Sequence, residues 1–95
     1  MSKRKIYTFE DDLKYRLKNT AFRKVWEESE AEYLVSKALI EKRLVSRMSQ
    51  RVLAKKAKTT QAVISRIESM SANPSINLLK KIAAVFDSRL KISFT

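Results

Sequence analysis

The chain has 95 residues, contains neither cysteine nor histidine, and carries 21 basic against 10 acidic side chains, for a formal net charge of +11. This length allows one modest hydrophobic core, and the missing residue types exclude disulfides, zinc–thiolate sites and His- or Cys-based catalysis. We therefore expect a single domain over residues 1–95 that is not an enzyme, with no catalytic residues, metal or cofactor.

The first predicted helix lies near the N-terminus. Thr8 is a good N-cap for it, because the threonine hydroxyl can accept a bond from a free backbone N–H of the first turn. Apolar side chains then recur at four-residue spacing and predict one buried face, made of Phe9, Leu13 and Leu17.

A second helical pattern starts at Asn19 or Thr20. Ser29 and Glu32 have the spacing of a capping box, so this helix could end and restart at Ser29, or it could continue unbroken to about Leu44. The pattern is compatible with both alternatives.

Two short helices are predicted between residues 49 and 69. Ser49 can cap the first of them, and Thr60, or Thr59, can cap the second. The side chains expected to face inward are apolar or small: Leu53, Ala54, Ala57, Ile64 and Ile67. Because a turn joins the two helices and a small residue allows them to cross closely, this segment has the parts of a helix-turn-helix.

A last helix and a strand are predicted after the loop at residues 71–74. Ser75 can cap the helix. Its apolar stripe is made of Leu78, Leu79, Ile82 and Phe86. Over residues 89–95 apolar and polar side chains alternate, which is typical of a strand.

The apolar face of this strand comprises Leu90, Ile92 and Phe94. A lone strand is not stable, so we expect it to pair with the same strand of a second chain across a two-fold axis and to make a homodimer. Pairing with residues 5–8 of the same chain is the alternative.

The positive charge is concentrated in the C-terminal half. Residues 47–95 hold ten basic side chains and only two acids, Glu68 and Asp87, whereas residues 1–46 hold eleven basic and eight acidic side chains. This excess favours a polyanion such as nucleic acid as the partner of the C-terminal half. No apolar run is long enough to span a membrane, and we expect a soluble, intracellular protein.

The run SQRVLAKKAKTTQAVISRIE, residues 49–68, resembles the helix-turn-helix pattern of the XRE family, to which the lambdoid phage repressors and Cro belong. The resemblance implies an all-α, lambda-repressor-like, five-helix DNA-binding domain over residues 35–86. A helical extension over residues 1–34 would precede this domain, and the short β-strand over residues 89–95 would follow it. The extension and the ending LKISF also resemble HigA-type antitoxins, which accompany RelE-like mRNA-cleaving toxins.

The second short helix is the candidate recognition helix, because a short helix can enter the major groove with its first turn and one face at the base edges. Gln61 can pair with adenine through two hydrogen bonds, and Arg66 can bind guanine or a phosphate. Ala62 and Ser65 are small enough to permit close approach. Contacts to the DNA backbone are expected from Gln50, Lys55, Lys58, Thr59, Thr60 and Asn73.

Some of these residues have a simpler explanation, since the threonines can cap a helix and the lysines can be solvated without DNA. The resemblance implies that Gln50 binds phosphate and braces Gln61, and that Glu68 pairs with Arg43 instead of contacting DNA.

The chain departs from the family pattern because it contains no glycine. The family usually has glycine at three helix ends, which are occupied here by Lys58, Met70 and Asp87. A left-handed backbone costs a residue with a Cβ about 1–2 kcal/mol. Either these turns bear that strain or they adopt another conformation.

The N-terminal half has aromatic side chains beside an acidic cluster, the four glutamates within residues 27–32. Such a surface could bind a basic ribonuclease. The expected toxin-binding residues are Phe22, Trp26, Glu27, Glu30 and Tyr33. The alternative is an extension of the core with a solvated acidic face.

We therefore expect the antitoxin of a type II toxin–antitoxin module, in the cytoplasm and nucleoid of a bacterial or archaeal cell. It would repress transcription as a homodimer on a palindromic double-stranded operator, and would neutralise a RelE- or HigB-like toxin in a complex that could be a heterotetramer. The alternative is a stand-alone XRE-type regulator of a phage or restriction system, without a toxin. An RNA-binding or membrane-surface protein would account for the charge but not for the helix-turn-helix spacing.

Overall fold

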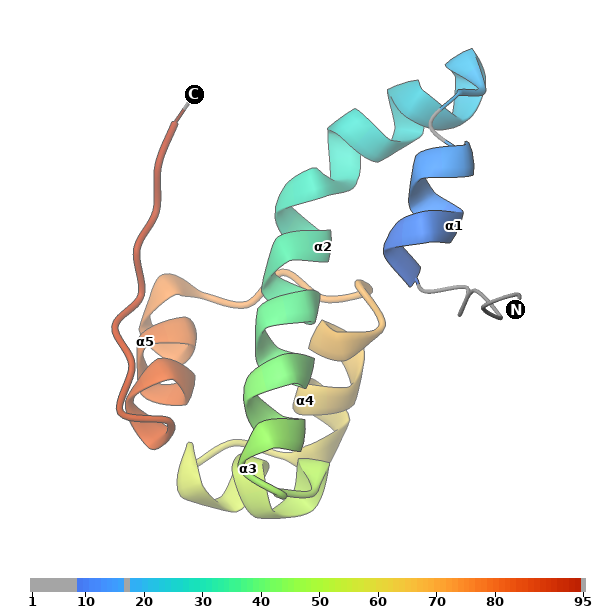
Figure 1. Cartoon of the computed structure of the whole chain (residues 1–95). Coiled ribbons are helices and arrows are strands. Elements are labelled where there is room, and N and C mark those ends of the chain that lie inside the picture. The colour runs from blue at the N-terminus through green and yellow to red at the C-terminus, as the bar shows by residue number, and fades with distance from the viewer. Residues whose placement is uncertain (1–8, 17, 95) are drawn as a thin grey trace, which may run out of the picture. The chain divides into compact units, whose positions relative to one another are not determined.

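In the computed structural model, residues 9–16 and 18–94 are described, and they form helices but no strand, so the all-α prediction is confirmed (Figure 1). The helices are α1 (Phe9–Arg16), α2 (Thr20–Val45), α3 (Gln50–Lys56), α4 (Gln61–Glu68) and α5 (Ile76–Val85). None of them is long and apolar enough to cross a membrane. Internal contacts divide the chain into two units, with the boundary between Glu30 and Ala31, inside α2.

The first predicted helix is formed and is α1. The predicted N-cap at Thr8 lies outside the described residues, as do residues 5–8 and the side chains of Phe9, Leu13 and Leu17.

α2 is one continuous helix of 26 residues, as the second sequence alternative allowed. It begins after Asn19, whose side-chain Oδ1 accepts a hydrogen bond from the backbone N–H of Phe22 at 3.0 Å. Ser29 does not start a new helix. Its hydroxyl donates to the backbone carbonyl of Val25 at 3.0 Å, a bond to the preceding turn that an unbroken helix accommodates.

The core of the second unit is formed where α2, α3, α4 and α5 meet. Leu53 of α3 and Ile64 of α4 have 0% exposure. The buried apolar cluster comprises Leu39, Leu53, Ala54, Ala57, Ile64, Ile67 and Ile82. The inward faces predicted for the two short helices are therefore confirmed, and burial of each large aliphatic side chain contributes about 1.5–3 kcal/mol.

Hydroxyl caps fix the starts of the last three helices, as the sequence predicts. Ser49, Thr60 and Ser75 are extended, and each side chain accepts a bond from the backbone N–H three residues later, at 3.1, 3.2 and 3.0 Å respectively. Each such cap is worth about 1 kcal/mol. Thr60, and not Thr59, is the cap of α4.

Four helices end in a left-handed residue that is not glycine: Arg47, Lys58, Met70 and Asp87, with φ between 53° and 63°. After α3, for example, the N–H of Thr59 donates to the carbonyl of Ala54 at 2.9 Å, and that of Lys58 to Lys55 at 3.2 Å. These bonds satisfy carbonyls that a helix end leaves free. The three turns at which the family usually has glycine therefore bear the strain. The turn at Arg47 is a fourth, which was not predicted from the sequence.

Two expectations for the C-terminal half need correction. Residues 35–86 contain four helices, counting the C-terminal part of α2, and not five, because only three N-caps start new helices in this range. The strand expected over residues 89–95 is not formed at residues 89–94, which leave α5 as an extended tail that runs first along this helix and then beyond it (Figure 1). The physical reason is that a strand requires a neighbour for its backbone hydrogen bonds.

Candidate nucleic-acid interface

The interface is built from α3, the turn that follows it, and α4. Ala54 and Ala57 are buried between the helices, and their small side chains allow the close approach that the sequence predicts. The left-handed residue Lys58 ends α3, and the Thr60 cap starts α4 three residues after Ala57. Local sequence thus fixes both the length of the turn and the direction in which α4 leaves it.

α4 has one buried and one exposed side. Ile64 and Ile67 face the core, whereas the four predicted base-reading residues are all exposed: Gln61, Ala62, Ser65 and Arg66. An α-helix with its side chains is about 10–12 Å across, so α4 fits the major groove, which is about 12 Å wide. The exposed side can therefore lie against base edges while the other side remains in the core.

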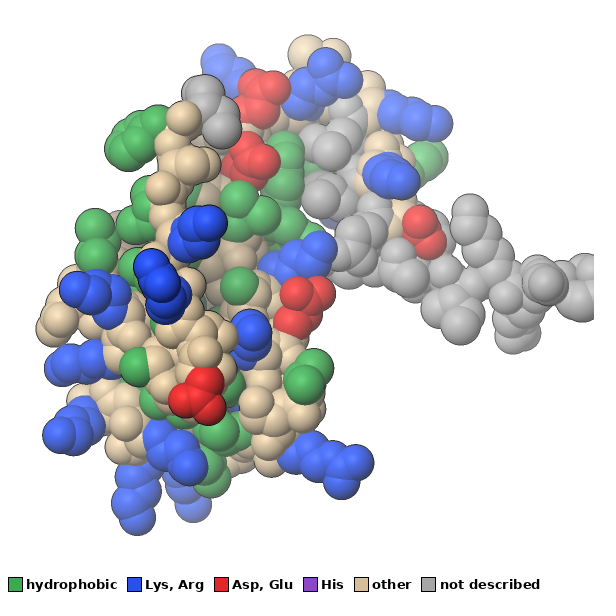
Figure 2. Space-filling view, turned by 60° about the vertical axis from the view of Figure 1, so that its left-hand side comes forward, with side chains coloured by type: hydrophobic (Ala, Val, Ile, Leu, Met, Phe, Trp, Pro, Cys, Tyr) green, Lys and Arg blue, Asp and Glu red, His purple; other side chains and the backbone are tan. Residues whose placement is uncertain are grey.

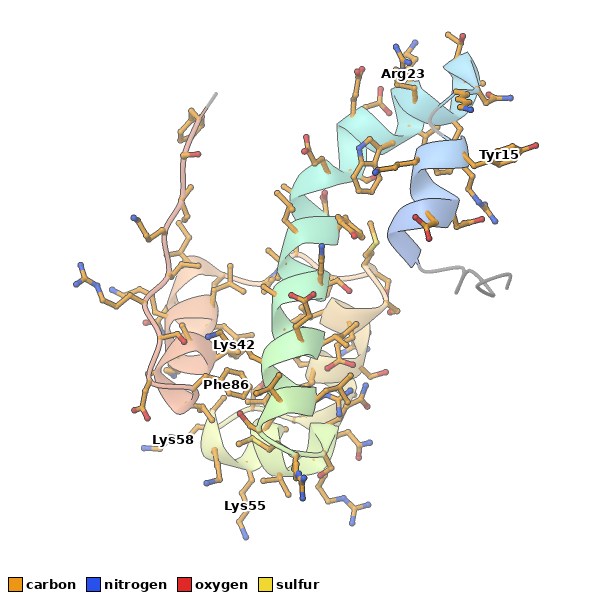
Figure 3. All side chains as sticks on the ribbon, in the orientation of Figure 1. Tyr15, Arg23, Lys42, Lys55, Lys58 and Phe86 are labelled. Carbon is orange, nitrogen blue, oxygen red and sulfur yellow. The ribbon has the colours of Figure 1, made fainter. Side chains whose placement is uncertain are left out.

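The residues predicted to contact the DNA backbone are placed differently from one another. Lys55 and Lys58 are exposed and point outward at the end of the molecule that holds α3 (Figure 3). Thr59 is half-buried, and Thr60 uses its hydroxyl as the cap of α4. Asn73 is exposed, but it lies in the loop after α4, beyond the end of this helix opposite to Gln61.

Glu68, at the C-terminal end of α4, is held by two other helices. The guanidinium of Arg43 on α2 donates to both carboxylate oxygens, at 2.7 and 3.1 Å, and to the carbonyl of Met48 at 3.0 Å. The side-chain amide of Gln50 on α3 donates to the same carboxylate at 3.0 Å. The implied Arg43–Glu68 pair is confirmed. Gln50 bonds to Glu68 here, and the phosphate contact and the bracing of Gln61 that the resemblance implies stay predictions.

This arrangement affects the electrostatics of the interface. Glu68 is one of only two acids in residues 47–95, and its side chain is 8% exposed and paired with a cation. It therefore adds little negative potential to the surface that would meet DNA. In Figure 2, Lys and Arg side chains gather around the lower part of the molecule, where α3 lies, with few acidic side chains among them.

One residue of this region was not predicted. Ser36 on α2 is 6% exposed, and its hydroxyl donates to the backbone carbonyl of Glu68 at 2.6 Å. It lies three and seven residues before Leu39 and Arg43, on the same face of the helix. That spacing could have shown that Ser36 faces inward. No local pattern, however, predicts that its hydroxyl bonds to Glu68, which is 32 residues away.

The residues predicted to bind a toxin, and those predicted to form the dimer, differ in exposure. Phe22 and Trp26 are half-buried in the N-terminal part of α2, and Glu27 and Glu30 are exposed there. Tyr33 is 6% exposed, so it offers little surface to a partner. In the tail, Leu90 is half-buried, whereas Ile92 and Phe94 are exposed, the latter at 99%.

Two short helices that cross at small side chains, the second with a polar and basic outer face, define a helix-turn-helix. The model of a helix-turn-helix family matches residues 39–92, more than half of the chain. The chain belongs to this XRE-type helix-turn-helix family and is a DNA-binding transcriptional regulator. No curated protein and no solved structure gives a significant match.

Proposed function

We propose that this regulator is a repressor that reads its operator with α4, and that it is also the antitoxin of a type II toxin–antitoxin module. The observation that carries the DNA-reading part is the division of α4 between Ile64 and Ile67, which are buried, and Gln61 and Arg66, which are exposed. Neither of the polar side chains stabilises the core, so both are available for base edges. Lys55 and Lys58 supply the phosphate contacts.

The repressor acts as a homodimer through the C-terminal tail. Ile92 and Phe94 expose large apolar surfaces in the single chain. Pairing of two tails across a two-fold axis would bury these side chains and would supply the backbone partners that a strand needs. The two copies of α4 would then read half-sites about 34 Å apart, one turn of DNA.

A random pool of duplexes should therefore yield a two-fold symmetric sequence when selected with the full chain. Ile92→Asp with Phe94→Asp should give a monomer in sedimentation and should weaken operator binding, because the charges oppose burial of the paired tails. Ser93→Asp, which places a charge on the alternate side of the same tail, is the matched control and should remain a dimer. A dimer that survives removal of residues 90–95, with undiminished operator binding, would show that the tail is not the contact.

The antitoxin role is supported by the charge of the N-terminal half. Glu27 and Glu30 are exposed beside the half-buried Phe22 and Trp26. DNA would repel these acids, whereas a basic ribonuclease would be attracted to them. Trp is also enriched among the few residues that carry most of the binding energy of an interface. Tyr33, which is buried, is left out of this surface. The chain would neutralise the toxin by covering it, without doing chemistry itself.

Growth rescue tests the antitoxin role. Co-expressed with the RelE-like toxin expected from a neighbouring gene, the full chain should restore growth, and Gln61→Ala should do so equally well. Glu27→Lys with Glu30→Lys should fail to rescue while retaining operator binding, since both side chains are exposed and the change reverses the charge that attracts the toxin. Full rescue by this charge-reversed variant would place the toxin site elsewhere on the chain.

A stand-alone regulator is the second candidate. It is favoured by the extent of the family match, which covers residues 39–92 and does not reach Phe22 or Trp26. The absence of a toxin gene beside the gene for this chain would support it.

A further inference from the structure

We infer that Ser36 is a positioning residue for DNA recognition, which holds the C-terminal end of α4 in the place that base contacts require. The inference rests on the proposed reading of DNA by α4. Ser36 itself lies on α2 and is buried, so it cannot touch DNA.

The bond from Ser36 satisfies a backbone group that α4 cannot satisfy internally. The last four carbonyls of an α-helix have no partner within the helix. In α4, the first three of these accept from the residues that follow in the chain: Ser65 from the N–H of Ser69, Arg66 from Ser71 and Ile67 from Met70. The fourth, the carbonyl of Glu68, accepts instead from the Ser36 hydroxyl of another helix.

Four hydrogen bonds from three residues of other helices therefore converge on Glu68. Arg43 and Gln50 hold the carboxylate of Glu68, and Ser36 holds its backbone. A bond to the Glu68 carboxylate does not fix the position of the α4 backbone, because rotation about the Glu side-chain torsions lets the helix shift while the bond persists. The bond to the carbonyl at 2.6 Å has less freedom, since it acts on the backbone of α4 directly and only the single χ1 torsion of Ser36 can absorb a shift. Ser36 thus restricts sliding and rotation of α4 against α2.

Contacts to base edges are lost when α4 slides or rotates slightly, whereas contacts to phosphates are kept. Hydrogen bonds to base edges need donor–acceptor distances of about 2.7–3.2 Å and good alignment, which Gln61 and Arg66 reach only if α4 is fixed. Lys55 and Lys58 bear long flexible side chains that can follow a small shift of the helix. Loss of the Ser36 hydroxyl should therefore lower affinity for the operator and leave affinity for random duplex unchanged.

The test compares three variants at a temperature at which each is fully folded. Ser36→Ala removes the hydroxyl and should keep the fold, because alanine is the best helix former. Ser36→Thr retains a hydroxyl. Ser29→Ala is the matched control, since Ser29 lies on the same helix and its hydroxyl donates only to carbonyls of α2, those of Val25 and Trp26.

The measured quantity is the ratio of affinities for the operator and for random duplex. In Ser36→Ala it should fall about tenfold, equivalent to the loss of one bidentate base contact, and in Ser36→Thr and Ser29→Ala it should stay within about twofold of the original. An unchanged ratio in Ser36→Ala, or an equal loss for both duplexes, would overturn the positioning role and leave a structural one. If the original chain does not distinguish the two duplexes, the proposed reading by α4 fails, and this inference fails with it.

Discussion

Replacement of Arg43 by alanine should lower the free energy of unfolding by about 3–5 kcal/mol, which is a large part of the 5–15 kcal/mol typical of a small domain. The variant leaves the Glu68 carboxylate buried, at 8% exposure, without the cation that donates to both of its oxygens. It also removes the donor to the Met48 carbonyl. Urea unfolding followed by circular dichroism measures the loss.

Arg16→Ala is the matched control, because Arg16 pairs with Asp12 at the same 2.7 Å distance but on an exposed helix surface. Side-chain exposures are 58% and 30% in that pair, against 16% and 8% for Arg43 and Glu68. Removal of the exposed pair should cost only about 0.5 kcal/mol. Joint replacement by Arg43→Met and Glu68→Leu should recover much of the lost stability. Equal small losses from Arg43→Ala and Arg16→Ala would show that burial does not strengthen the first pair.

The double variant Gln61→Ala, Arg66→Ala should lose about 2–6 kcal/mol of discrimination between the operator and other sequences, since each bidentate base contact contributes about 1–3 kcal/mol. Both side chains are exposed, so the free energy of unfolding should change by no more than about 0.5 kcal/mol. Gln61→Ala alone should relax the preference at one base pair. Competition binding against a library of operator variants measures both effects.

Lys55→Ala is the control for loss of charge without loss of base reading. Lys55 is exposed on α3, so the variant should bind all sequences more weakly by a similar factor and should reduce the salt dependence of binding by about one counterion. Undiminished discrimination in the double variant would exclude α4 as the recognition helix, and with it the proposed operator reading.

The parts of this protein that the sequence predicts correctly are those that depend on neighbouring residues. The caps at Ser49, Thr60 and Ser75 need only a hydroxyl and a backbone N–H three residues away. The inward position of Ile64 and Ile67 follows from the helical period. Because the helix-turn-helix consists of such local features in a short run, both its place and its exposed face can be predicted.

Tertiary structure decided the features that depend on residues far apart in the chain. Whether α2 breaks at Ser29 was open in the sequence, because a serine can cap a helix or bond back to the preceding turn. The burial of Tyr33 removed it from the predicted toxin surface, although its residue type suits an interface. The tail at residues 89–94 has a strand pattern without a strand, since the pattern does not supply the neighbour.

Glu68, at the end of α4, has one partner that was predicted from the sequence and two that only the structure shows. The sequence resemblance assigned the Arg43 partner of Glu68, and the structure confirms it. Only the packing of α2 and α3 against α4 decided that Gln50 and Ser36 also bond to Glu68. Hydrogen bonds act over about 3 Å, so a partner 18 or 32 residues away is determined by how the helices pack, and not by any pattern of adjacent residues.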